Sequence, residues 1–138
     1  EVCTRVVADA EPRLRRLSNV QHLFTPVRGQ LPGGRSVLDL VERLHPTPAV
    51  GDFPRERALA IIRQHEALDR GWYAAPFGWV GADGQGEFVV GLRSALVRGE
   101  TATLFAGCGI VAQSNPETEL AEWGWKLRPM LAALGVES

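Results

Sequence analysis

Residues with chemical potential gather near the C-terminus, where a loop of small residues leads into a helix start and then into paired carboxylates. Gly107 and Gly109 lie in this loop, and glycine lets a ligand approach main-chain N–H groups closely. Glu119, Glu122 and Lys126 follow at spacings of three and four, which place them on one face of a helix. Two such carboxylates favour a hard divalent cation such as Mg²⁺, which prefers oxygen ligands. The stretch therefore predicts a substrate carboxylate site beside a metal site.

The alternative for this helix face is a solvated surface with one i,i+4 ion pair. Such a pair contributes only about 0.3–0.5 kcal/mol, and exposed Glu/Lys pairs are common. The metal-site interpretation therefore depends on the other residues that gather around it.

Arg93 is the strongest candidate for holding an anionic substrate. It lies in the middle of a predicted strand, with Gly91 and Ala95 on its own face, and these small neighbours leave room for a ligand. Its guanidinium offers a two-pronged match to a carboxylate. The alternative is an arginine in a salt bridge or on an edge strand.

Tyr73 and His22 are further candidates with structural alternatives. Tyr73 is the only tyrosine of the chain, and its hydroxyl could reach a pocket while its ring packs. The alternative is an aromatic core residue. His22 is a lone histidine on a predicted strand, and alone it is typical of a hydrogen-bonded structural residue.

The cysteines and histidines argue against a zinc site. Cys3 and Cys108 have no metal-ligand spacing, and the three histidines are isolated from them and from one another. We expect reduced thiols, with Cys108 a small buried residue rather than a nucleophile.

A helix that begins near residue 116 must position the carboxylates. Ser114 or Asn115 can cap it, Pro116 suits its first turn, and Glu117 could complete a capping box with Ser114. An apolar stripe is expected to dock this helix on the body of the protein, formed by Leu120, Trp123, Leu127, Met130, Leu131 and Leu134.

The N-terminal half predicts strands, a turn and two helices. Residues 14–20 resemble a half-buried strand, and residues 20–31 a strand with an irregular middle, broken by Pro26 and Gly29. After a turn at residues 32–34, Ser36 caps a short helix through Leu44. Residues 45–54 hold three prolines and are expected to be extended. A longer helix follows from Pro54 to about Leu68.

The remaining segments predict antiparallel strands over residues 72–80, 87–97 and 101–106. Asp83-Gly84 is typical of a hairpin, and Arg98-Gly99-Glu100 forms a second turn. Strands with inserted helices and a final helix indicate an α+β or layered α/β fold, with an antiparallel sheet flanked by helices.

Composition indicates an ordinary globular chain of 138 residues, 45% hydrophobic, with a formal net charge of −1. We expect one domain with a core of its own. The charge argues against nucleic acid or an anionic membrane as partner. No apolar run approaches the roughly 20 residues of a membrane span, and no signal peptide is evident, so a cytoplasmic location is expected. Because Glu1 is not Met, we expect a piece of a longer protein.

Several segments together resemble the C-terminal part of chorismate-utilising enzymes, with isochorismate synthase the most similar branch. The resemblance runs through nearly the whole chain. The segments that carry it are, in order, Ser18 to Leu23, His45 to Val50, Asp69 to Val80, Leu92 to Ala95, and Gly107 to Lys126.

The resemblance implies a Mg²⁺-dependent isomerisation, in which water adds at C2 of the chorismate ring while the C4 hydroxyl leaves. It implies Glu122 as a magnesium ligand with Glu119 as an auxiliary ligand, and Arg93 and Tyr73 as residues that hold the substrate's carboxylates. One carboxylate is received by the backbone of Ala106, Gly107, Cys108 and Gly109. Lys126 and His22 fall on pocket positions.

Ala49 stands where anthranilate and aminodeoxychorismate synthases usually place Thr, which favours the water-using branch. Two departures from the family pattern are Asp52, where glycine is common, and Trp123-Gly124-Trp125, where polar residues are usual.

The family's general base, its general acid and its other magnesium glutamate come from an N-terminal region that this chain lacks, so no catalytic residue is expected here. The resemblance thus predicts an isomerase whose partners are chorismate and the N-terminal part of the same enzyme. It would serve a menaquinone, siderophore or salicylate pathway. The alternatives are a salicylate or anthranilate/aminodeoxychorismate synthase component, and a non-catalytic fragment or subunit.

Overall fold

The computed structural model describes residues 2–17 and 21–136, which fall into two compact units. The first unit contains Glu1–Arg43 with Val80–Gly86, and the second contains Leu44–Trp79 with Glu87–Ser138. Helices and antiparallel strand pairs make up both, which confirms the predicted α+β class.

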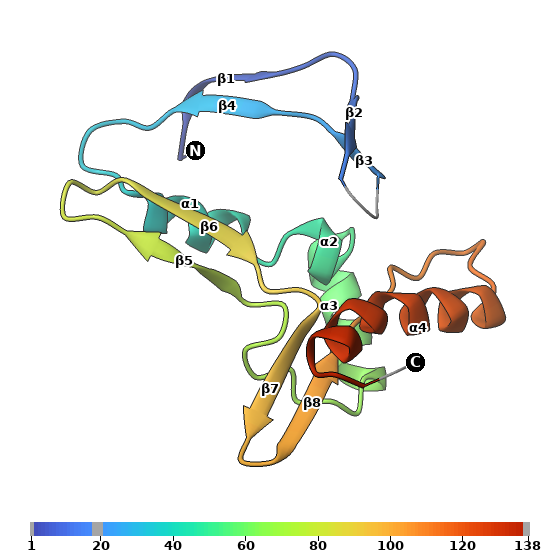
Figure 1. The fold of residues 1–138 in the computed structure, drawn as a ribbon. Helices are drawn as coiled ribbons and strands as arrows, with labels where there is room; N and C mark the ends of the chain where they lie inside the picture. The colour runs from blue at the N-terminus through green and yellow to red at the C-terminus, as the bar shows by residue number, and fades with distance from the viewer. Residues whose placement is uncertain (1, 18–20, 137–138) are drawn as a thin grey trace. The chain divides into compact units, whose positions relative to one another are not determined.

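Two antiparallel strand pairs open the first unit (Figure 1). Strand β1 (Thr4–Ala8) pairs with β4 (Val27–Gln30), and β2 (Arg13–Arg16) pairs with β3 (Gln21–Phe24). The break between β3 and β4 includes Pro26, as predicted. The second predicted break, at Gly29, was wrong, because Gly29 lies within β4. The part of the predicted first strand at residues 18–20 lies outside the described residues.

Helix α1 (Val37–Leu44) begins where its capping residues predict. The Ser36 hydroxyl accepts from the Leu38 N–H at 3.2 Å, and the Asp39 carboxylate accepts from the Ser36 N–H at 2.7 Å. This reciprocal pattern satisfies N–H groups that have no partner inside the helix. The prediction of a short helix from Ser36 through Leu44 is confirmed.

The proline-rich segment, residues 45–54, opens the second unit. We had expected it to be extended throughout, but it is not. Residues Pro48–Gly51 form a single helical turn, α2, which packs beside α3 (Arg55–His65). A proline is compatible with this turn because Pro48 occupies the first helical position, where no intrahelical N–H bond is lost. Helix α3 ends before the predicted Leu68 because the backbone of Glu66 is extended, with φ −85° and ψ 108°.

Strands β5 (Pro76–Val80) and β6 (Gly86–Val90) pair and are joined by the predicted turn. The Asp83 carboxylate accepts from the Gln85 N–H at 3.1 Å, and Gly84 has a φ of 79°, a conformation that favours glycine.

Two strand predictions were too long. The predicted strand over 87–97 is divided into β6 and β7 (Ser94–Arg98), because Gly91 leaves the ladder and bonds backbone to backbone with Ala74 and Ala75. The predicted strand over 72–80 begins only at Pro76, because residues 72–75 form a turn in which Ala74 has a φ of 64°.

Strand β8 (Thr101–Phe105) pairs antiparallel with β7, and helix α4 (Pro116–Ala133) contacts β8 (Figure 1). The Asn115 carboxamide oxygen caps α4 by accepting from the N–H groups of Glu117 and Thr118. The alternative box of Ser114 with Glu117 is not formed, since the Ser114 hydroxyl accepts from Val111 instead.

The expected core is not found among the described residues, where Ala74, at 5% exposed, is the one buried hydrophobic side chain. Each described sheet contains only two strands, and a two-stranded ribbon buries little without a layer against it. The apolar stripe of α4 is likewise only partly covered: Leu120 is 67% exposed, whereas Leu127, Met130 and Leu131 are half-buried.

Candidate functional site

Helix α4 holds the glycine loop by its carbonyl groups. The Lys126 ammonium donates to the carbonyl oxygen of Gly107 at 3.0 Å, and the Trp123 indole donates to that of Ala106 at 3.1 Å. Within the described residues, nothing accepts a hydrogen bond from the N–H groups of Gly107, Cys108 or Gly109. The loop therefore keeps backbone donors available while its carbonyls are occupied.

The two predicted metal ligands lie beside this loop. One carboxylate oxygen of Glu122 lies 2.6 Å from the Lys126 ammonium. Ligand atoms of Glu119, Glu122 and Cys108 all lie within 4.8 Å of one another. Two carboxylates at this separation suit a small hard cation, whereas the thiol suits a softer one. The donor set thus fits Mg²⁺ through Glu119 and Glu122, with Glu122 48% exposed and accessible to an ion.

Protonation in this cluster is set by the contacts of Lys126 and Cys108. Partial burial lowers the pKa of Lys126, but the hydrogen bond to Glu122 and the neighbouring thiol outweigh it, so the net shift is upward. Burial raises the pKa of the Cys108 thiol, which the nearby ammonium only partly offsets. The ammonium therefore stays charged and the thiol stays protonated at neutral pH, which does not favour a cysteine nucleophile.

Tyr73 lies against the same loop. Its ring stacks on that of Phe105 with centroids 5.4 Å apart, and its hydroxyl oxygen is 2.9 Å from the position that a Cβ on Gly107 would occupy. Burial raises the pKa of Tyr73, so its phenol remains a hydrogen-bond donor across the physiological range. The absence of a Cβ at Gly107 thus allows the tyrosine hydroxyl to approach the loop this closely.

Arg93 lies just before β7 rather than within a strand, with a φ of 49°. Ser94 pairs with Phe105, so Arg93 and Ala106 leave the β7–β8 hairpin at the same end. The side chain is exposed and forms no hydrogen bond or ion pair with any residue in the described part of the chain. A left-handed conformation costs a non-glycine residue about 1–3 kcal/mol, and such strain clusters at functional sites.

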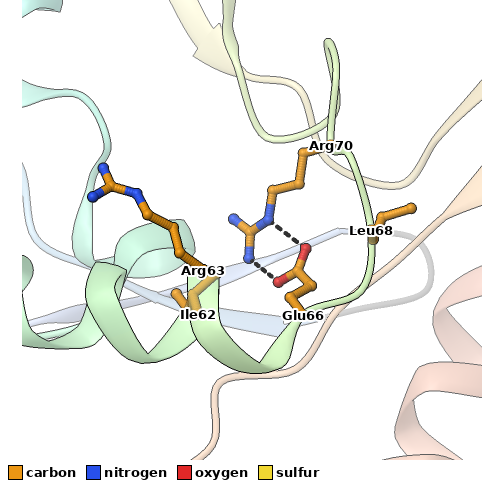
Figure 2. Close-up of a pocket in the computed structure, with 5 residues that line it drawn as sticks. All are labelled: Ile62, Arg63, Glu66, Leu68 and Arg70. Carbon is orange, nitrogen blue, oxygen red and sulfur yellow. Dashed lines mark hydrogen bonds and ion pairs between the residues drawn. The ribbon is translucent and has the colours of Figure 1, made fainter.

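Ala49 lies in α2, one residue before a contact that sequence reasoning missed. Arg70 forks onto both carboxylate oxygens of Glu66, at 2.7 and 2.6 Å (Figure 2). It also donates to the carbonyl oxygen of Val50 at 2.9 Å. The hydrogen bonds lower the pKa of Glu66 and raise that of Arg70. A shallow hollow of about 270 Å³ beside this pair is lined by Ile62, Arg63, Glu66, Leu68 and Arg70.

The hydrogen bond from Trp123 to the glycine loop is a second contact that the sequence did not reveal. The tryptophan side chain was expected in the apolar stripe, but its indole N–H binds the loop. The signal that could have found it is its spacing, because Trp123 precedes Lys126 by three residues and both therefore share one helix face.

His22 lies in the first unit, on β3 opposite Arg15, and is exposed. The structure therefore brings together, in the second unit, Tyr73, the Ala106 to Gly109 loop, Glu119, Glu122 and Lys126. The substrate role of His22 stays a prediction.

Comparisons with known proteins identify the family of this chain. The sequence profile described as chorismate binding enzyme matches residues 1–135. The chain belongs to the chorismate-binding enzyme family. Isochorismate synthase MenF of Bacillus subtilis is 52% identical over 135 residues, which are 98% of this chain and 29% of that protein. Salicylate biosynthesis isochorismate synthase of Pseudomonas aeruginosa is 54% identical over 123 residues, which are 89% of this chain and 26% of that protein.

The fold is that of a solved member of the family. A crystal structure from Bacillus anthracis, described as a 2,3-dihydroxybenzoate-specific isochorismate synthase, superposes with a TM-score of 0.92 at 39% identity. The superposed region covers 99% of this chain and 36% of the Bacillus anthracis chain. The chain thus spans about a quarter to a third of the length of these relatives. Among the helices of the described residues, none has both the length and the apolar character to cross a membrane.

Proposed function

We propose that this chain is the C-terminal portion of an isochorismate synthase, which converts chorismate to isochorismate by adding water at C2 of the ring as the C4 hydroxyl leaves. The observation that carries the proposal is the position of Lys126, whose ammonium binds the Gly107 carbonyl and the Glu122 carboxylate together. The Lys126 ammonium thereby joins the glycine loop to the acidic residues of α4. The chain that carries this arrangement matches the chorismate binding enzyme family.

The carboxylates of chorismate would be held by this chain's own donors. The free N–H groups of Gly107, Cys108 and Gly109 supply backbone hydrogen bonds, and the Tyr73 phenol adds another. Arg93 supplies an unpaired guanidinium at the same end of the β7–β8 hairpin. These groups orient the ring and offset its negative charge.

Magnesium is part of the proposal, with Glu122 as a ligand and Glu119 as an auxiliary one. The cation would supply electrostatic stabilisation of the charge that develops as the hydroxyl departs. Lys126 would hold the Glu122 carboxylate in place by its 2.6 Å contact and leave the second oxygen of that carboxylate available. The raised pKa of the Cys108 thiol and the preference of Mg²⁺ for oxygen ligands argue against this thiol as a ligand.

The general acid and base are proposed to come from the rest of the enzyme, because the chain spans only 29% of the MenF relative. Ala49 supports water rather than ammonia as the nucleophile. The product would feed a menaquinone, siderophore or salicylate pathway, and the cytoplasmic location predicted from the sequence stays a prediction.

The test is a product assay on the complete protein that carries this chain. Chorismate is supplied with Mg²⁺, with and without ammonium, and products are separated by chromatography. Isochorismate formed equally in both conditions supports the proposal. Ammonia-dependent anthranilate or aminodeoxychorismate, or direct release of salicylate, would instead assign the chain to another branch.

The second candidate is a non-catalytic fragment, which the short coverage of the relatives favours. Turnover by the isolated 138-residue chain would exclude it. We expect no turnover, because no acid or base is assigned to these residues.

A further inference from the structure

Arg70 forms hydrogen bonds with three separate residues, two through its guanidinium and one through its backbone carbonyl. Its guanidinium binds Glu66, the residue that follows the end of α3, through two hydrogen bonds. The same guanidinium donates to the Val50 carbonyl in α2, and the Arg70 carbonyl accepts from the Tyr73 N–H at 2.7 Å. One residue therefore ties together α2, the end of α3 and the turn that carries Tyr73.

The Arg70 and Glu66 pair is not a helix-surface ion pair, although the residues are four apart in sequence. The helix has ended at His65, and both side chains are only 29% exposed. A planar guanidinium that forks onto a carboxylate fixes its own orientation as well as its position. The third guanidinium nitrogen then donates to the carbonyl oxygen of Val50, the neighbour of Ala49.

Tyr73 connects this junction to the glycine loop. Its ring is stacked on Phe105 and its hydroxyl lies close to Gly107, whose carbonyl is held by Lys126. The contacts therefore run without interruption from α2 through Arg70 and Tyr73 to the loop and α4.

We propose that Arg70 is a positioning residue that holds Tyr73 and the Ala49-bearing turn in register with the substrate loop. The inference rests on the proposed function, because it assigns Arg70 an effect on substrate binding. It acts through Tyr73 rather than by touching the substrate. Lysine cannot replace it, because a single ammonium does not reproduce the fork and the third contact together.

The experiment is a double-mutant cycle of Arg70→Gln and Tyr73→Phe in the complete protein, with kcat and KM measured for chorismate. Arg70→Lys is the conservative variant. Arg35→Gln is the matched control, because Arg35 also pairs with a carboxylate four residues away, Asp39, but contacts none of these site residues. Thermal unfolding of each variant reports whether it is folded.

We expect Arg70→Gln to lower kcat/KM at least tenfold, mainly through KM, and Arg70→Lys to recover little of it. The double variant should be at most about threefold worse than the poorer single variant, because both substitutions act through the same Tyr73 hydroxyl. The control should stay within twofold of wild type. Losses that multiply in the double variant, or a folded Arg70→Gln or Arg70→Lys variant with wild-type KM, would overturn the proposal.

A second measurement does not require chorismate turnover. The titration of Tyr73 is isolated by subtracting the ultraviolet pH titration of each Tyr73→Phe counterpart. The charged groups around this phenol are Arg70, Glu66, Lys126 and Cys108, and Arg70 lowers its pKa. Arg70→Gln should raise the pKa of Tyr73, and an unchanged value would refute the proximity of the Arg70 charge to this phenol. If turnover is absent but this pKa rises, the proposed function fails while the proximity of Arg70 to Tyr73 stands.

Discussion

Adding one methyl group at Gly107 should disturb the site through a single identifiable contact. A Cβ at this position would lie 2.9 Å from the Tyr73 hydroxyl oxygen, about 0.5 Å inside an ordinary contact of 3.4 Å. The phenol cannot simply swing aside, because its ring is stacked on Phe105. The backbone contributes no strain of its own, since Gly107 is absent from the described glycines with positive φ.

The expected cost follows from this overlap. Overpacking a fitted contact destabilises by about 1–3 kcal/mol, and we expect Gly107→Ala to fall near the lower end because one oxygen is affected. Activity should fall more steeply, because a misplacement of about 1 Å near reacting groups can cost a factor of about 100.

The assay is equilibrium unfolding and chorismate turnover of the complete protein carrying Gly107→Ala, Tyr73→Phe or both. Because phenylalanine lacks the clashing oxygen, Gly107→Ala should lose most of this cost of about 1 kcal/mol in the Tyr73→Phe background. Gly109→Ala is the matched control, since a Cβ there meets nothing within 4 Å. An equal cost in both backgrounds, or an equal effect at both glycines, would refute this account of the loop.

Three further substitutions test other parts of the structure by equilibrium unfolding. Asn115→Ala should destabilise by about 1 kcal/mol because it removes the cap of α4, and Asn115→Asp should not; equal losses would contradict the assigned cap. Asp52→Gly should stabilise by about 1 kcal/mol, because the backbone of Asp52, with a φ of 59° and a ψ of −174°, is strained for any residue but glycine. Asp83→Gly is the control: like Asp52, Asp83 accepts a hydrogen bond from a nearby backbone N–H, but its φ is not positive, so this substitution should destabilise. The Arg70 hydrogen bond lowers the pKa of Glu66. The stabilisation from the Arg70–Glu66 pair should therefore be fully present above the unfolded pKa of about 4.3, and it should be lost as the pH falls through the lowered pKa of the folded state. Glu66→Gln should lack this acid-dependent loss of stability, and a pH profile identical to that of wild type would count against the pair.

Local signals in the sequence were sufficient for the elements whose boundaries are set by neighbouring residues. Ser36, the Asp83-Gly84 turn and the start of α4 were predicted because caps and turns are decided within a few residues. The helical spacing of Glu119, Glu122 and Lys126 was sufficient to place them together for the same reason.

Tertiary contacts decided what the sequence could not show. The strand expected through Arg93 is broken because Gly91 pairs with residues 74 and 75, which lie far away in sequence. The fork of Arg70 onto Glu66 depends on α3 ending at His65, and local propensity does not fix that end. The expected core was not found in the described residues because two-stranded ribbons cannot provide one.

The backbone conformation of Asp52 accounts for one departure from the pattern that the resemblance implies. The family commonly has glycine at this position, and the observed φ of 59° lies in the region that glycine adopts without strain. The departure from the pattern that the resemblance implies is therefore a local backbone cost and does not involve the acidic residues of α4.

The central claim, that the acidic face of α4 holds magnesium beside the substrate loop, is tested most directly by a Mg²⁺ titration of chorismate turnover. The complete protein is compared with Glu122→Gln and with Glu117→Gln, a control on the same helix outside the cluster. We predict that Glu122→Gln raises the Mg²⁺ concentration for half-maximal activity at least tenfold and that Glu117→Gln leaves it unchanged. A Glu122→Gln enzyme with the wild-type magnesium requirement would contradict the claim.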